Sequence, residues 1–286
     1  MPVYNGAKYI RAAVDSLLAQ TFADFELIIS DNASTDGTET ICREYAARDR
    51  RVRYTRQNEN YGPFLNFKFV MDKAFGEYFM WAAADDVWDL RYIEALLPVS
   101  ARYQCLAFGL VQTIDADGKK LMHPANCRKF EFSGSRFVRR FKFYMAPGFM
   151  GKANPIYGLF PTASLKAIGL SVLGSGIPGS DTIFLYNLLS GMEIRHAGNV
   201  FAYKRLHAGC LGRGPDPRTG KFDLWERLTD FMKWTVFSAG TMQYIRESSV
   251  LESVLQVAAY PIIVAHVILR GIFFKIRRCY PPRNPG

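Results

Sequence analysis

Apolar and polar positions along the first third of the chain follow a helical period, then a strand, then a helical period again. Residues 7–19 carry apolar side chains three and four positions apart, at Ile10, Ala13, Val14, Leu17 and Leu18. This spacing predicts a helix that packs one face on a sheet. The apolar run 25–29 (FELII) predicts a strand, and it ends in the polar cluster 30–38 (SDNASTDGT).

The same alternation continues to residue 86. A striped helix is expected from Thr38 to about Ala46, opened by a capping box of Asp36 and Glu39. A strand is expected over 52–56, a helix over 67–75, and a strand over 77–84 that runs into Asp85 and Asp86. Strands that alternate with helices predict an α/β fold with a mostly parallel sheet and helices on both faces. Ligands of such sheets bind at the carboxyl ends of the strands, where residues 30–36 and 85–86 fall.

One strand of this pattern is shorter than expected. The helix over 7–19 should follow an apolar strand, yet only Met1 to Tyr4 precede it. We expect that the first strand is truncated and that the native start lies roughly 5–10 residues upstream, about one strand length.

Beyond residue 105 the pattern is looser. A strand is expected over 106–115, a turn over 116–120 and a helix over 180–191. We expect one domain over 1–210, with a nucleotide-binding part at about 1–115 and an acceptor-binding part at about 116–210. A helical tail over 211–286 follows.

The apolar part of this tail, 254–276, is interrupted by Gln256, Pro261, His266 and Arg270, so it lacks the run of about 20 apolar residues that a spanning helix needs. Its cations fit a helix that lies on an anionic membrane surface, and a helix docked on the domain is the equal alternative.

Charge and cysteine content narrow the class of protein. The formal net charge of +10 favours acidic partners such as a sugar-nucleotide diphosphate or anionic lipid. No zinc-finger or RNA-recognition motif is present, so we expect no nucleic-acid partner. The five cysteines have no C-x-x-C spacing, and the opening MPVYNG has no signal-peptide pattern. We therefore expect a cytoplasmic protein.

Six short motifs occur in one characteristic order. They are PVYNG (2–6), SDNASTDGT (30–38), NENYGPFLN (58–66), GEYFMWAAADD (76–86), SD (180–181) and YKRLH (203–207). Over roughly residues 1–210 the chain therefore resembles the family 2 glycosyltransferases, which have a Rossmann-like GT-A type fold. The resemblance implies inverting transfer of a sugar from a UDP-, GDP- or dTDP-linked donor to a saccharide or lipid-linked acceptor. It also implies a role in cell-surface polysaccharide or glycolipid synthesis, at the cytoplasmic face of the inner membrane.

The same motifs imply a donor site. Asp31 and Asn32 follow a strand, where a carboxylate can accept from a base N–H and a second polar group can hold ribose hydroxyls. Many relatives have two aspartates here, so Asn32 is a departure. Arg205 is suited to phosphate oxygens because its guanidinium is a planar fork. The complete set expected to bind the nucleotide sugar is Pro2, Tyr4, Asn5, Asp31, Asn32, Asn60, Gly62, Asn66, Asp85 and Arg205.

A nucleoside diphosphate leaves with negative charge, which a hard divalent cation can neutralise. The resemblance implies Mg²⁺ or Mn²⁺ held by Asp85, Asp86 and His207. The usual D-x-D motif has Ala83 at its first position here, so one acidic ligand is absent.

Asp181 is the candidate general base for the acceptor hydroxyl, and a helix cap is its structural alternative. Segment 154–160 resembles the family's acceptor-side segment. Three rival interpretations remain: a catalytically impaired relative that still binds nucleotide sugar, a nucleotidyltransferase, and a glycoside hydrolase with paired carboxylates.

Overall fold

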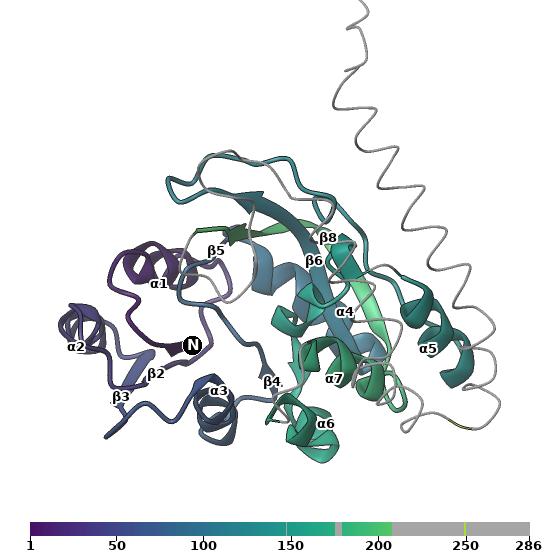
Figure 1. Ribbon diagram of the computed structural model, residues 1–286, viewed down its shortest axis with the longest axis horizontal. Helices are drawn as coiled ribbons and strands as arrows, with labels where there is room; N and C mark the ends of the chain where they lie inside the picture. The colour runs from purple at the N-terminus through teal and green to yellow at the C-terminus, as the bar shows by residue number, and fades with distance from the viewer. Residues whose placement is uncertain (147, 175–178, 208–248, 250–286) are drawn as a thin grey trace, which may run out of the picture.

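The computed structural model describes residues 1–146, 148–174, 179–207 and 249 (Figure 1). The predictions for the tail, from residue 211 onward, lie outside these residues apart from Ser249. Within the described part of the chain, no helix combines the length and the apolar character needed to cross a membrane.

The N-terminal part is a parallel sheet covered on both faces. Its three strands have the order β1 (Pro2–Val3), β2 (Leu27–Asp31), β3 (Val52–Arg56), and all pairs are parallel. Every residue of β2 is buried, as expected for a parallel strand covered on both sides. Leu27 and Ile29 pack into the cluster that contains α1 (Ile10–Leu18), whereas Ile28 packs into the cluster that contains α3 (Pro63–Asp72). Helix α2 (Thr38–Arg48) packs against β3.

A second sheet carries the other half of the fold. Its order is β5 (Val87–Trp88), β8 (Ile194–Arg205), β6 (Leu106–Ile114), with β6 parallel and β5 antiparallel to β8. Helix α4 (Tyr92–Tyr103) packs against β6 and β8. A two-stranded antiparallel sheet pairs β4 (Tyr78–Phe79) with β7 (Phe160–Pro161). The expected mixed α/β architecture, with a parallel sheet and flanking helices, is thus confirmed.

The remaining helices lie on the side of the molecule away from α1 and α2 in Figure 1. They are α5 (Arg136–Met145), α6 (Thr162–Ile168) and α7 (Ser180–Leu188), with short 3-10 turns η1 (Gly148–Met150), η2 (Asn154–Tyr157) and η3 (Ser171–Gly174). Trp81 is fully buried where these parts meet, and the rings of Phe79, Phe160 and Phe184 contact it edge-on.

Several expected boundaries are wrong in detail. The strand expected over 77–84 ends at Phe79, and the chain then passes to Asp85 without strand pairing. The helix expected to reach Phe75 ends at Asp72, and Phe75 is 79% exposed beneath the guanidinium of Arg53. The helix expected over 180–191 ends at Leu188. The Asp36–Glu39 capping box does not form, because Glu39 pairs with Arg43 and Arg56 instead.

Strand β1 has only two residues, Pro2 and Val3, which pair with Ser30 and Asp31. Met1 extends this pairing. Its N-terminal amino group donates to the carbonyl of Ile28 at 2.7 Å, and its carbonyl accepts from the Ser30 N–H. This register brings the loop after β1 alongside the loop after β2.

Candidate active site

A pocket of about 360 Å³ opens where the loops after β1 and β2 face the segment before β5 and the end of β8. Most of the residues predicted for the donor and metal sites line this pocket: Pro2, Tyr4, Asn5, Asn32, Asn60, Asn66, Asp85, Asp86, Arg205 and His207. Asp31, Gly62 and Asp181 do not line it. The fold thus brings residues from five of the six sequence motifs together around one pocket; the sixth motif, SD (180–181), does not line it.

One end of the pocket is acidic. The Asp85 carboxylate lies 3.0 Å from the Nε2 of His207, and the Asp86 carboxylate accepts the backbone N–H of Arg205 at 2.8 Å. Asp86 is 7% exposed. Burial, followed by the charge of Asp85, raises the pKa of Asp86 to about 7. The Asp86 carboxyl is therefore held in a place that penalises its ionisation.

The topology explains how residues so distant in sequence meet here. Strand β5 begins directly after Asp86 and pairs antiparallel with the end of β8, with Val87 opposite Tyr203. This pairing places the acidic pair beside residues 204–207.

Arg205 connects the segment before β5 with the turn after β6 through side-chain hydrogen bonds. Its Nε donates to the carbonyl of Asp85 at 2.9 Å, and its Nη1 donates to the carbonyls of Asp115 and Ala116, each at 3.1 Å. Its guanidinium also lies 4.9 Å from the ring centre of Tyr9. Arg205 is 7% exposed, so its donors point mainly to the main chain of the segments that it joins.

The acidic end suits a hard divalent cation in its donor chemistry. Asp85, Asp86 and His207 offer carboxylate oxygens and an imidazole nitrogen, and a cation would relieve the repulsion that raises the pKa of Asp86. In the described part of the chain, however, no group of three or more His, Cys, Asp or Glu side chains is already arranged to hold a metal ion. Further ligands would have to come from the phosphates of a bound donor or from water.

Amide side chains form another part of the pocket lining. Asn32 Nδ2 donates to Asn60 Oδ1 at 2.6 Å and to the carbonyl of Gly62 at 3.2 Å, and Asn32 Oδ1 accepts the backbone N–H of Tyr61 at 3.0 Å. Asn66 Nδ2 donates to the carbonyl of Ser30 at 3.0 Å. These bonds hold the segment 60–62 against the end of β2, and they give a neutral, polar lining.

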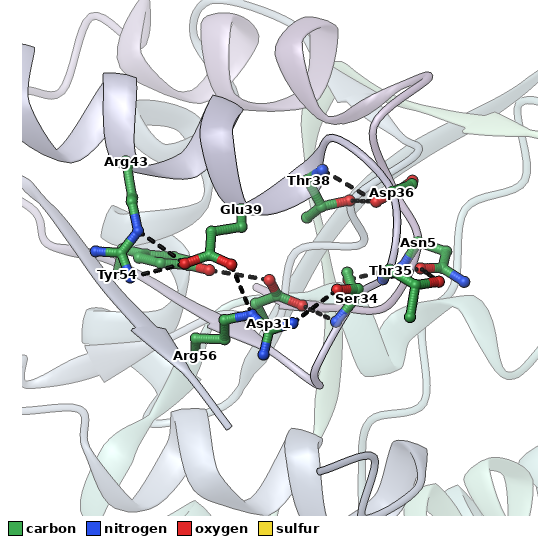
Figure 2. A network of polar contacts seen from close by, with 10 residues as sticks. All are labelled: Asn5, Asp31, Ser34, Thr35, Asp36, Thr38, Glu39, Arg43, Tyr54 and Arg56. Carbon is green, nitrogen blue, oxygen red and sulfur yellow. Dashed lines mark hydrogen bonds and ion pairs between the residues drawn. The ribbon is translucent and has the colours of Figure 1, made fainter. Parts of the chain in front are cut away.

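Asp31 lies behind this lining rather than in the pocket. It is fully buried, and its carboxylate accepts the backbone N–H of Ser34 and the hydroxyl of Tyr54, each at 2.9 Å. Figure 2 shows these bonds at the centre of a polar network. A ligand would reach Asp31 only if this network opened.

The same network joins the two loops that border the pocket (Figure 2). Asn5, in the left-handed region with φ 51°, accepts the backbone N–H of Thr35 at 2.9 Å, and its own backbone N–H donates to Ser34 Oγ at 2.9 Å. Asp36 accepts from the backbone N–H groups of Ala7 and Thr38. Burial opposes the charge of Asp36, but bonds from Thr38 and Ala7 outweigh it and lower the pKa of this carboxyl.

Asp181 lies in the first turn of α7 and accepts its neighbour Thr182's backbone N–H at 2.7 Å. It does not line the pocket, whereas Tyr157 does. Burial chiefly, and then the charges of Asp86, Asp85 and Asp181, raise the pKa of the Tyr157 hydroxyl.

Tyr157 and Lys204 are among the pocket residues that the sequence did not single out. Tyr157 is in segment 154–160, which the sequence assigns to the acceptor only as a whole. Lys204 lines the pocket, and its Nζ donates to Asn154 Oδ1 at 3.1 Å. Its place within YKRLH, directly before Arg205, was the usable signal.

Comparisons with known proteins agree with this geometry. The family model described as glycosyl transferase family 2 matches residues 1–155. The chain is 42% identical over 94 residues to an uncharacterized glycosyltransferase of Rickettsia typhi, covering 33% of this chain and 28% of that protein. It is 33% identical over 104 residues to the putative teichuronic acid biosynthesis glycosyltransferase TuaG of Bacillus subtilis, covering 36% of this chain and 41% of that protein. The matches thus span well under half of these relatives.

Among solved structures, S. aureus TarS 1-349 in complex with UDP superposes with a TM-score of 0.56 at 18% sequence identity, covering 99% of this chain and 72% of that one. The same protein in complex with UDP-GlcNAc gives a TM-score of 0.52, also at 18% identity, covering 85% of this chain and 68% of that one. At this identity the likeness concerns the fold alone. Because the family model covers more than half of the chain and the fold agrees with it, this chain belongs to glycosyl transferase family 2.

Proposed function

We propose that the protein transfers a sugar from a nucleotide-diphosphate donor to an acceptor hydroxyl, with inversion and with the help of a divalent cation. The observation that carries the proposal is the pairing of Asp85 with His207 beside the buried Asp86, in a pocket that is also lined by the amides of Asn32, Asn60 and Asn66. The acidic residues suit a cation that holds phosphates, and the amides suit a polar nucleoside.

UDP-linked sugars are the first donors to test, because TarS, which shares the fold, has been solved with UDP and with UDP-GlcNAc. In the pocket, Asn60 and the backbone beside Tyr4 and Asn5 would hold the base and ribose. The likeness to TuaG supports an acceptor from cell-envelope polysaccharide synthesis.

A divalent cation, when bound to Asp85, Asp86 and His207, would neutralise charge on the departing diphosphate. The chain's own residues would do the rest. His207 is oriented by Asp85, and Arg205 fixes the main chain of Asp85 through its Nε. Asp181, in the first turn of α7, would accept the proton of the acceptor hydroxyl.

The test is calorimetric titration of the full chain with UDP, GDP and dTDP, each with Mn²⁺ and with EDTA. We expect one of the three to bind, more tightly with Mn²⁺. Asp85→Asn and Asp86→Asn should reduce the Mn²⁺-dependent gain roughly tenfold or more, since each removes a charged contact worth about 1.5–3 kcal/mol.

Asp117→Asn is the matched control, because Asp117 is exposed in the turn after β6 and loses the same charge. Binding of no nucleotide in either buffer would contradict the donor-site proposal. Metal-dependent binding without sugar transfer to any acceptor would instead favour a catalytically impaired relative, which the absence of an acid at Ala83 makes the second candidate.

A further inference from the structure

The pocket is lined by a basic side chain, that of Lys204, which was not among the residues predicted for the donor site. Of the described residues that line it, Lys204 and Arg205 are the two with permanently basic side chains. Arg205 directs its Nε and Nη1 to main-chain carbonyls of Asp85, Asp115 and Ala116, so it is committed to the frame of the site. Lys204 is therefore the candidate for direct contact with an anionic ligand.

Lys204 is held in place by a buried partner. Asn154 is 6% exposed, and its Oδ1 accepts one N–H of the Lys204 ammonium at 3.1 Å. An ammonium has three N–H donors, so this bond aims the group and leaves donors for a ligand. Asn154 begins η2, the same turn that brings Tyr157 into the pocket.

The charge of Lys204 also acts on the acidic end. It is near enough to lower the pKa of Asp86, against the larger raising effects of burial and Asp85. A ligand that bridges the acidic end and Lys204 must carry several anionic oxygens, because the carboxylates reach it through a cation and Lys204 reaches it directly. A diphosphate has this chemistry, whereas a neutral sugar does not.

We propose that Lys204 binds the diphosphate of the donor directly, and that Asn154 positions it for this contact. The inference rests on the proposed function, since it takes the pocket to be the donor site. It gives the site a protein-borne positive charge beside Asp85 and Asp86, in a chain where Ala83 leaves the metal one acidic ligand short of the family's usual motif. Lys204 would then share with the cation the task of stabilising the leaving group.

The experiment compares UDP, UMP and uridine by calorimetry, in Mn²⁺ and in EDTA, for the wild-type chain and three variants. Lys204→Met should weaken UDP binding about ten- to hundredfold, the usual value of a charge-assisted hydrogen bond, and should leave uridine binding unchanged. Lys204→Arg should lose less, because it keeps the charge. Lys142→Met, which removes the same charge at an exposed position of α5, should bind all three ligands as wild type does.

The outcomes separate this inference from the proposed function. If the wild-type chain binds UDP and Lys204→Met binds it equally well, the role of Lys204 is overturned and the donor site stands. An equal loss of UDP, UMP and uridine binding would overturn it too, since it would mean that Lys204 shapes the pocket rather than contacts phosphate. If the wild-type chain binds neither UDP, GDP nor dTDP in either buffer, both proposals fail.

Discussion

At the scale of single residues, Asp86 shows most directly how a residue of the site lowers the stability of the folded protein. Burial first, and then the charge of neighbouring Asp85, raise the pKa of its carboxyl to about 7, whereas the ordinary value for an aspartate is 3.8. The folded chain therefore keeps a proton on Asp86 at pH values where the unfolded chain has lost it. Between these two pKa values, folding takes up a proton, so the free energy of unfolding must fall as pH rises.

This gives a measurable prediction for the metal-free protein. In EDTA, the contribution of Asp86 should lower the free energy of unfolding as the pH rises from 5 to 7, by at most about 1.4 kcal/mol per pH unit for a single proton. Asp86→Asn keeps the shape and cannot ionise, so denaturant titrations of this variant should lack that contribution. Asp117→Asn, at an exposed turn, should keep the wild-type slope.

An identical pH slope in Asp86→Asn and in the wild type would show that the buried carboxyl titrates normally. With Mn²⁺ present the slope should become smaller in the wild type, because a bound cation favours the ionised form. The residue that weakens the apo fold at neutral pH is thus the residue that a cation would stabilise.

At the scale of elements, the start of α3 depends on one backbone conformation. Gly62 precedes this helix with φ 82°, in the left-handed region, and its carbonyl accepts from Asn32 Nδ2. A Cβ added at Gly62 would meet nothing within 4 Å, so the cost of a side chain there is conformational rather than steric contact with neighbours.

We therefore expect Gly62→Ala to lower the free energy of unfolding by about 1–3 kcal/mol, because φ 82° with ψ 166° is a conformation that essentially only glycine adopts. Gly191→Ala is the matched control, since a Cβ at Gly191 also meets nothing within 4 Å and its φ lies outside the left-handed region. Chemical denaturation of both variants decides the matter. Equal midpoints for the two would show that the 60–62 segment adapts at no cost.

The elements also show which parts of the fold could be predicted from the sequence. Strand β2, helix α2 and strand β3 were predictable, because their apolar periods are regular and polar clusters mark their ends. The strand expected over 77–84 was not confirmed beyond Phe79. Within the apolar run YFMWAAA, Phe79, Trp81 and Ala82 are buried, and Trp81 packs against three aromatic rings without pairing in a sheet. An apolar run reports burial, and pairing depends on which edge the fold brings alongside.

The residues of the candidate site likewise divide into those that the sequence could predict and those that it could not. Asp85 and Asp86 could be predicted, because two acids directly after an apolar run are unusual, and the structure places both in the pocket. Asp31 was expected to face a ligand, yet its carboxylate bonds to Tyr54 from the neighbouring strand. Such a contact depends on strand register, which no local pattern in the sequence specifies.

At the scale of the whole molecule, the pocket draws on the chain well beyond the segment matched by the family model. That match covers residues 1–155, whereas Tyr157 and the 204–207 segment, which also line the pocket, come later. The pairing of β5 with β8 brings the later segment to the earlier one. A fragment that ends near residue 155 would therefore lack Lys204, Arg205 and His207, and with them one side of the site.

The excess of positive charge gives the last prediction, on where the molecule acts. The chain has a formal net charge of +10, and no acidic residue follows Glu252, whereas Arg270, Lys275, Arg277 and Arg278 do. If this tail lies on an anionic membrane surface, each of these cations contributes about 1 kcal/mol to binding. Replacing all four by glutamine should weaken co-sedimentation with phosphatidylglycerol-containing vesicles by at least tenfold.

Net charge alone would also attract the protein to such vesicles, so the control must remove the same charge elsewhere. Glutamine at Lys119, Lys120, Lys129 and Lys142 does this, because all four are exposed in the described part of the chain. A tail-specific contact predicts strong loss for the tail variant and little for the control. Equal loss in both would indicate general electrostatic attraction. No loss in either would favour a tail docked on the domain, which would place the transferase at the membrane only through its acceptor.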